Sequence, residues 1–106
     1  MTSVVDAPHR RITLDEVRAH RDEIYRIAEQ YGVSNVRVFG SVARDEADDD
    51  SDLDLLIDVA PGHGLFAMAG FALDVEELLN VFTQVVTPNG LKERIRDEVL
   101  TDAVPV

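Results

Sequence analysis

The sequence predicts an α/β domain, and three observations lead to this class. Segments in which apolar residues recur at helical spacing alternate with short runs of β-branched and aromatic residues. Apolar residues make up 45% of the 106 residues, which is enough for one packed core. A chain of this length accommodates one domain rather than two. We therefore expect a single domain at residues 12–106, preceded by a flexible arm at residues 1–11.

The first expected helix follows this arm and begins at Thr13. Glu16 lies three residues further on, which completes the pattern of a capping box. Apolar residues then recur at helical spacing as far as Tyr31. Gly32 is well placed to end the helix, because glycine adopts the left-handed conformation that closes many helices.

The rest of the chain continues the alternation of strands and helices. The segment 35–39 is rich in β-branched and aromatic residues, and 53–59 is apolar enough to lie inside a sheet. Proline and glycine between 61 and 64, and again between 88 and 90, predict breaks. In chain order we expect a strand at 35–39, a short helical segment after Gly40, a strand at 53–59, a helix at 65–80, a strand at 82–87, a helix at 91–100 and an apolar tail at 101–106.

The formal net charge of -11 is unevenly distributed. Residues 1–44 carry seven Lys or Arg against six Asp or Glu, whereas residues 45–106 carry three against fifteen. The second part would repel a phosphate backbone, so no direct nucleic-acid binding is expected. It would suit a basic protein partner or divalent cations. An acidic surface that serves only solubility remains the alternative.

Several classes of protein are excluded by what the sequence lacks. There is no cysteine, so disulfides and cysteine-based zinc sites are ruled out. No apolar run is long enough to span a membrane, and the first residues do not resemble a signal peptide. His9, His20 and His63 share no ligand spacing, so a histidine metal site is not expected. These features predict a cytoplasmic protein without a membrane partner.

Gly40 and Ser41 form the first half of a candidate site. They follow an expected strand directly and open a short helical segment. The unpaired backbone N–H groups at such a turn attract anions, and the Ser41 hydroxyl adds a donor. Glycine also lets a phosphate approach the backbone closely. A Gly-Ser pair alone is a weak signal, because most such pairs occur in ordinary turns.

Asp52 and Asp54 form the second half. Residues two apart on a strand point to the same face, so these carboxylates would lie side by side. Two like charges at that separation repel each other unless a cation lies between them. Carboxylate oxygens, together with the phosphates of a substrate, are the ligands that Mg²⁺ prefers. A pair that merely lies at a solvated strand end is the alternative.

The spacing between the two halves supports the interpretation that they form one site. Ten residues separate Ser41 from Asp52, enough for one short helix and a return loop. The anion site and the carboxylates would then face each other across neighbouring strands. Donors would hold the β- and γ-phosphates, a metal would bridge phosphate and carboxylates, and the α-phosphate would stay open to attack. This arrangement predicts a nucleotidyl-transfer site.

The segment "GSVARDEADDDSDLDLLIDV" resembles the signature of the nucleotidyltransferase superfamily related to DNA polymerase β. More narrowly, the chain is similar to the minimal nucleotidyltransferases, which act as antitoxins beside HEPN-domain ribonuclease toxins. The resemblance implies a small α/β fold with a short mixed β-sheet flanked by helices. It also implies Mg²⁺-dependent transfer of AMP from ATP to a tyrosine of the toxin. By this resemblance Asp52 and Asp54 are the catalytic and metal-binding residues, and the nucleotide is held by Gly40, Ser41, Arg44 and Ser51.

One position departs from the pattern of the family. The family has a third carboxylate on the next strand, and this chain has Gln84 there. A Gln amide carries no charge and does not accept the proton of an attacking hydroxyl as a carboxylate does. Two hypotheses therefore stay open: an adenylyltransferase antitoxin, and an inactive transferase fold that neutralises its toxin by binding alone.

Overall fold

The computed structural model describes residues 9–106. Most of the expected flexible arm, residues 1–8, lies outside the described residues. The residues that follow it contact the domain. The Arg10 guanidinium donates to the carboxylate of Glu16 and to the backbone carbonyls of Leu79 and Asn80, and Ile12 is fully buried in the core.

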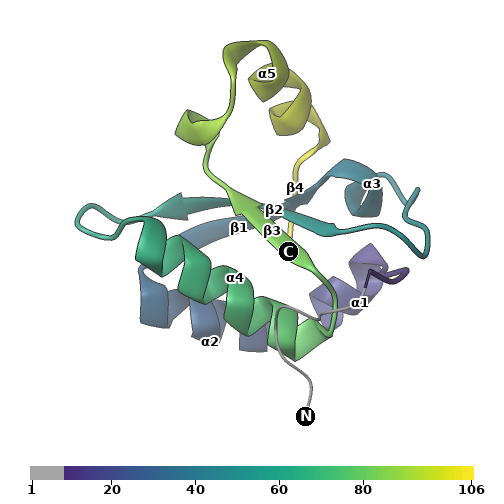
Figure 1. Cartoon of the computed structure of the whole chain (residues 1–106), viewed down its shortest axis with the longest axis horizontal. Coiled ribbons are helices and arrows are strands. Elements are labelled where there is room, and N and C mark those ends of the chain that lie inside the picture. The colour runs from purple at the N-terminus through teal and green to yellow at the C-terminus, as the bar shows by residue number, and fades with distance from the viewer. Residues whose placement is uncertain (1–8) are drawn as a thin grey trace.

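Four strands form one mixed sheet in the order β3-β2-β1-β4 (Figure 1). The first strand, β1 (Val33–Phe39), pairs antiparallel with β2 (Leu53–Val59) on one side and with β4 (Val104–Pro105) on the other. Strand β2 pairs parallel with β3 (Thr83–Val86). The expectation of an α/β fold with a short mixed sheet is confirmed, and β2 occupies the interior of the sheet.

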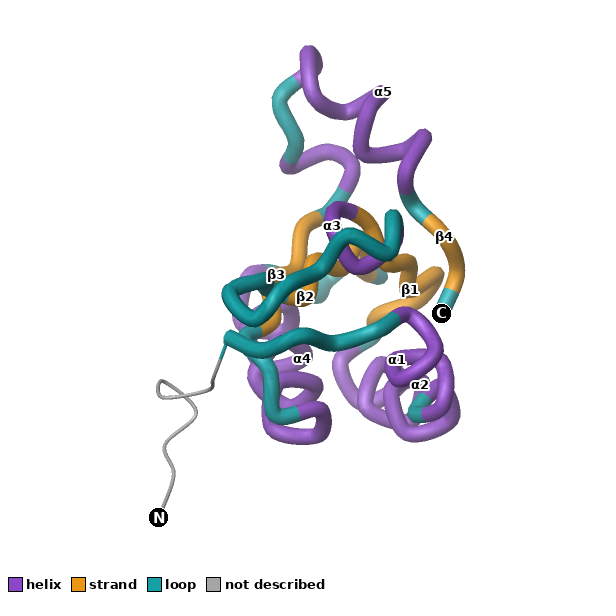
Figure 2. Tube along the Cα trace, turned by 90° about the vertical axis from the view of Figure 1, so that its right-hand side faces the viewer, coloured by secondary structure: helices purple, strands orange, loops and turns teal. Residues whose placement is uncertain are grey.

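Helices cover both faces of the sheet. Below it in Figures 1 and 2 lie α2 (Arg21–Tyr31) and α4 (Leu65–Leu79), which contact each other. On the opposite side lie α3 (Gly40–Ala43) and α5 (Glu93–Asp102), preceded by the short 3-10 helix η2 (Pro88–Gly90). The core fills the space between the sheet and α2 and α4, and its fully buried members include Ile24, Val38, Leu55, Phe71 and Val75. Within residues 9–106, every helix is too short or too polar to cross a membrane.

The expected single helix from Thr13 to Tyr31 is wrong, because the chain forms α1 (Leu14–Ala19) and α2 with a break at His20. Thr13 is the N-cap, as expected, and its hydroxyl accepts from the backbone N–H of Glu16. At the break, the backbone N–H of His20 bonds to Val17 three residues back. The imidazole Nδ1–H of His20 donates instead to the carbonyl of Glu16, at 3.0 Å. This side-chain bond replaces the bond from the backbone N–H of His20 to the Glu16 carbonyl that a continuous helix would make. Because a polar side chain causes the break, the spacing of apolar residues does not reveal it.

The C-terminal tail packs on its own domain. Strand β4 pairs with β1, and the backbone N–H of Val106 donates to the carbonyl of Val36. Arg18 donates to the carbonyl of Pro105, and Arg21 donates to the carbonyl of Val106. The tail therefore closes the edge of the sheet beside β1 and covers backbone groups that would otherwise be exposed.

Candidate active site

Asp52 and Asp54 lie where β2 begins, in the middle of the sheet. Asp54 is the second residue of β2, and its Cα pairs with Phe39 at the end of β1 and with Gln84 on β3. Asp52 immediately precedes the strand. Because β1 and β2 are antiparallel, the turn from β1 into α3 comes back beside these carboxylates. The two halves that the sequence predicts are thus neighbours in the fold.

Gly40 opens this turn and lies against Asp54. Its φ of +73° is in the left-handed region, which glycine adopts without strain. A Cβ added at this position would lie 2.8 Å from Oδ2 of Asp54. The absence of a side chain at Gly40 therefore makes room for the Asp54 carboxylate as well as for the turn. The sequence alone assigns Gly40 to phosphate approach and gives no sign of this contact.

We expect Gly40→Val to lower the free energy of unfolding by about 1–3 kcal/mol, because a β-branched residue is strained at positive φ. The side chain would also displace the Asp54 carboxylate, so calorimetry should show weaker binding of Mg²⁺-ATP. Gly64→Ala is the matched control, because φ at Gly64 is ordinary and nothing lies within 4 Å of its added Cβ. Equal unfolding midpoints and equal ATP affinities for Gly40→Val and the wild type would contradict the assigned role.

Burial and neighbouring charges together determine the pKa of Asp54. Burial, and after it the negative charge of Asp52, raise the pKa of Asp54 from its ordinary value of 3.8 to about 6, although the positive charge of Arg44 acts in the opposite direction. At neutral pH the pair is therefore held together against its own repulsion. A divalent cation would relieve this repulsion.

The raised pKa of Asp54 predicts how stability depends on pH when divalent cations are removed by a chelator. In the unfolded chain Asp54 ionises near 3.8 and in the folded chain near 6, so ionisation costs the folded state stability. The cost is absent below about pH 4, grows as pH rises to about 6 and is complete above that. At pH 7.5 Asp54→Asn should therefore unfold at a higher denaturant concentration than the wild type. After allowance for partial exposure, its free energy of unfolding should be higher by about 1–2 kcal/mol.

Asp49→Asn, a substitution in the exposed acidic loop, is the control for this effect and should not reproduce it. The advantage of Asp54→Asn should disappear below pH 4. An advantage that is the same at pH 3.5 and 7.5 would show that the ionisation of Asp54 is not its cause.

Both oxygens of Asp52 have a neighbour. Gln84 Nε2 donates to Oδ2 at 2.9 Å, and Nδ1 of His9 lies 2.6 Å from Oδ1. Gln84 thus lies beside both aspartates on β3, where the resemblance to the family predicts a third carboxylate. The sequence does not predict the contact between His9 and Asp52, because the two residues are forty-three positions apart and no spacing rule connects them.

Ser41 also belongs to this turn. It is half-buried in α3, next to Gly40. Within residues 9–106 no hydrogen-bond partner is found for its hydroxyl, although its backbone carbonyl accepts from the N–H of Glu46. The hydroxyl thus remains available to a ligand at the opening of α3.

Ser51 and Arg44 bond to their surroundings instead. The Ser51 hydroxyl accepts from the N–H of Asp48 at 2.9 Å and donates to the Asp48 carboxylate at 3.1 Å, which orders the acidic loop. Arg44 bonds to Glu46 at 3.0 Å and to Asp102 of α5 at 2.5 Å. Within the described residues neither side chain bonds to Asp52 or Asp54, although the charge of Arg44 is close enough to lower the pKa of Asp54.

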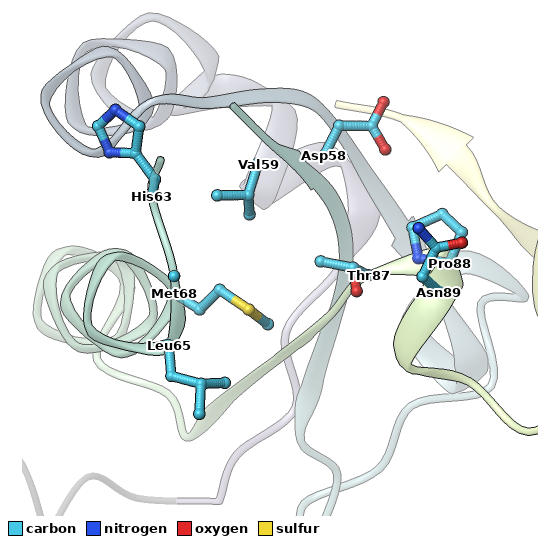
Figure 3. A pocket seen from close by; sticks show the side chains of 9 residues that line it. Asp58, Val59, His63, Leu65, Met68, Thr87, Pro88 and Asn89 are labelled. Carbon is cyan, nitrogen blue, oxygen red and sulfur yellow. The ribbon is translucent and has the colours of Figure 1, made fainter. Parts of the chain in front are cut away.

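A separate hollow of about 610 Å³ lies at the far end of β2 (Figure 3). It is lined by Asp58 and Val59 of β2, by Met68 of α4, and by Thr87 and Pro88, which follow β3. Asp58 is four residues beyond Asp54, roughly 13 Å along the strand, and it is paired with Arg37 at 3.2 Å. This hollow is thus distinct from the site at the start of β2.

The donors of the site fit a divalent cation that binds together with a nucleotide. Asp52 and Asp54 provide carboxylate oxygens, whereas Gln84 directs its amide nitrogen, which does not bind a cation, toward Asp52. Among residues 9–106, no three His, Cys, Asp or Glu side chains surround a common point. A cation here would complete its coordination with phosphate oxygens and water, as Mg²⁺ does in sites that use one or two carboxylates.

Comparisons with known proteins agree with this geometry. The model of the nucleotidyltransferase domain family matches residues 17–105. The protein adenylyltransferase MntA of Thermococcus cleftensis is 34% identical over 99 residues, which cover 90% of this chain and 97% of the relative. A solved structure assigned to the minimal nucleotidyltransferases superposes with a TM-score of 0.79 at 42% identity, covering 90% of this chain and 97% of the other. A crystal structure of a toxin-antitoxin complex with AMP-PNP shares the fold, with a TM-score of 0.66 at 16% identity over 79% of this chain and 69% of the other.

The chain therefore belongs to the nucleotidyltransferase domain family, in the polymerase β-like superfamily. Within that family it is of the minimal type, the MNT group to which MntA belongs. The expectations of this fold and of a nucleotidyltransferase enzyme are confirmed.

Proposed function

We propose that this chain is an antitoxin that transfers AMP from ATP to a tyrosine of a cognate HEPN-domain ribonuclease toxin in the cytoplasm, with Mg²⁺ as cofactor. One observation carries the proposal: at the start of a central strand Asp54 lies directly against the glycine turn of Gly40, and Asp52 is close enough for its charge to raise the pKa of Asp54. The MntA relative, a named protein adenylyltransferase, supports a protein acceptor.

Each half of the site has a separate task. The backbone N–H groups and the Ser41 hydroxyl at the start of α3 would orient the triphosphate. Asp52 and Asp54 would hold the cation, which when bound supplies positive charge against the phosphates. Gly40 keeps Asp54 close to the turn, so that the carboxylates and the phosphate donors share one small volume.

In the transfer, the tyrosine oxygen forms a bond to the α-phosphorus and the bond from that phosphorus to the β-phosphate oxygen breaks. Pyrophosphate leaves with the bonding electrons, and the phenol proton passes to water or to the pyrophosphate. Gln84 cannot accept this proton, because an amide is not a base at neutral pH. The site therefore relies on orientation and charge neutralisation more than on base catalysis, which predicts a slow transfer.

The charge distribution supports a basic protein partner. Residues 45–106 hold fifteen acidic and three basic side chains, and the acidic loop borders the site. Complementary charge accelerates encounter with a basic ribonuclease. Asp102 and Glu46 are already paired with Arg44, so a partner would meet chiefly the exposed loop carboxylates, Asp48, Asp49 and Asp50.

A second function is favoured by one specific observation. Gln84 donates a hydrogen bond to Asp52 in the place where a further carboxylate would otherwise lie. A site with this neutral amide could bind nucleotide and partner without productive transfer. In that case the antitoxin would silence the toxin by occupying it.

One experiment distinguishes the two functions: the chain is co-expressed with the candidate toxin, and the intact mass of the toxin is measured. We expect the toxin to gain one or more AMP units with the wild-type chain and none with an Asp52→Asn, Asp54→Asn double variant. An unmodified toxin in a tight, inactive complex with the wild type would instead support inhibition by binding alone.

A further inference from the structure

His9 lies at the site although it is far from the other site residues in sequence. Its Nδ1 is 2.6 Å from Oδ1 of Asp52, on the side of the carboxylate opposite to Gln84. The ring packs against Phe82, with a centroid separation of 5.2 Å and an angle of 40° between the planes. Phe82 in turn is fixed to the start of β2, because its carbonyl accepts from the N–H of Leu53 at 2.9 Å.

The backbone that follows His9 is anchored to the domain. The next residue, Arg10, donates to the carbonyls of Leu79 and Asn80 at the end of α4 and to the Glu16 carboxylate in α1. Ile12 is fully buried. The imidazole is half-exposed, with 50% of its side chain accessible, so it is held in place yet open to a ligand.

We propose that His9 is a nitrogen ligand that shares a divalent cation with Asp52. Two neighbouring ligands of an octahedral cation, each about 2.1 Å from the metal, are about 3.0 Å apart. The present separation of 2.6 Å between Nδ1 and Oδ1 would need to increase by only a few tenths of an ångström. The cation would take the place of the proton between the two atoms and fill its remaining positions with phosphate oxygens and water.

The nitrogen ligand sets a cation preference. Imidazole binds Mn²⁺ and Co²⁺ more strongly than Mg²⁺, which favours oxygen ligands alone. The N/O pair of His9 and Asp52 therefore predicts that the site prefers Mn²⁺ or Co²⁺ to Mg²⁺. The inference rests on the cation site of the proposed function and adds a ligand to it.

The test is the electron spin-echo modulation of Mn²⁺ bound to the chain without a histidine tag, in the presence of a non-hydrolysable ATP analogue. The wild type should show coupling of Mn²⁺ to a directly bound ¹⁴N nucleus, and His9→Ala should lose it. His63→Ala is the matched control, because His63 is exposed beside the hollow at the far end of β2 and should keep the coupling. By calorimetry, His9→Ala should lose at least about tenfold in Mn²⁺ affinity and less in Mg²⁺ affinity.

The outcomes separate this inference from the proposed function. Bound Mn²⁺ without ¹⁴N coupling in the wild type would overturn the role of His9 and leave the carboxylate site intact. Tighter Mn²⁺ binding by His9→Ala would also overturn it, since His9 would then be a competitor for Asp52. A wild type that binds neither Mn²⁺ nor Mg²⁺ with the analogue present would overturn the cation site itself.

Discussion

Asp52→Asn and Asp54→Asn should each reduce AMP transfer by about 10³-fold or more, while the chain remains folded. Each substitution removes one of the two charges that hold a cation against the phosphates. The amide keeps the size of the side chain, so the core beside Leu53 and Leu55 should not be disturbed. At neutral pH and without divalent cations, Asp54→Asn should even be the more stable form, because it removes a partly buried charge next to another.

Asp49→Asn is the matched control for these substitutions, because it removes the same charge from the exposed loop. With saturating partner it should transfer AMP at nearly the wild-type rate, because a charge in the loop affects the encounter with the partner and not the transfer step. Rates are compared by incorporation of labelled AMP into the partner, with thermal unfolding measured in parallel. Retention of activity in either site variant, or unfolding of both, would mean that the aspartates are not the catalytic pair.

Gln84→Asp should increase the rate of transfer by about 10²–10⁴-fold, because a carboxylate at this position could both bind the cation and accept the proton of the attacking hydroxyl. The Cα of Gln84 is in register with Asp54, and its side chain already reaches Asp52 at 2.9 Å. Without divalent cations the same substitution should lower the melting temperature, since three carboxylates would then be adjacent. Mg²⁺ with ATP should restore it.

Gln30→Asp, on the exposed surface of α2, is the control for added charge and should change neither rate nor metal-dependent stability. The affinity for the partner should be nearly the same in both variants and the wild type. No gain in rate from Gln84→Asp, together with a fast wild type, would show that Gln84 does not occupy the base position.

The local pattern of the chain was sufficient to predict the elements that position the site. Strand β2 has the expected bounds, because an apolar run between an aspartate-rich loop and a Pro-Gly break has few other ways to fold. The turn after Phe39 is also predicted locally, because Gly40 and Ser41 directly follow the strand. Asp52, Asp54 and Gln84 then become neighbours through strand pairing, which the resemblance to the family anticipates.

What the sequence could not reveal depends on tertiary contacts between distant residues. His9 reaches Asp52 only because Arg10 and Ile12 bind the chain to α4 and to the core. Arg44 fits the motif of the family, yet in the fold it pairs with Asp102, a residue of α5 that no local pattern connects to it. A search for regular spacing detects partners on one element, so it does not predict the contact of His9 with Asp52, which only the fold brings about.

The most direct measurement of the central claim uses ATP labelled either at the α-phosphate or at the γ-phosphate, incubated with the chain, Mg²⁺ and its purified partner. Transfer of AMP predicts that only the α label enters the partner and that the label is absent with the Asp52→Asn, Asp54→Asn double variant. Incorporation of the γ label would identify a phosphotransferase instead. No incorporation of either label, with the ribonuclease still inhibited, would contradict an enzymatic antitoxin.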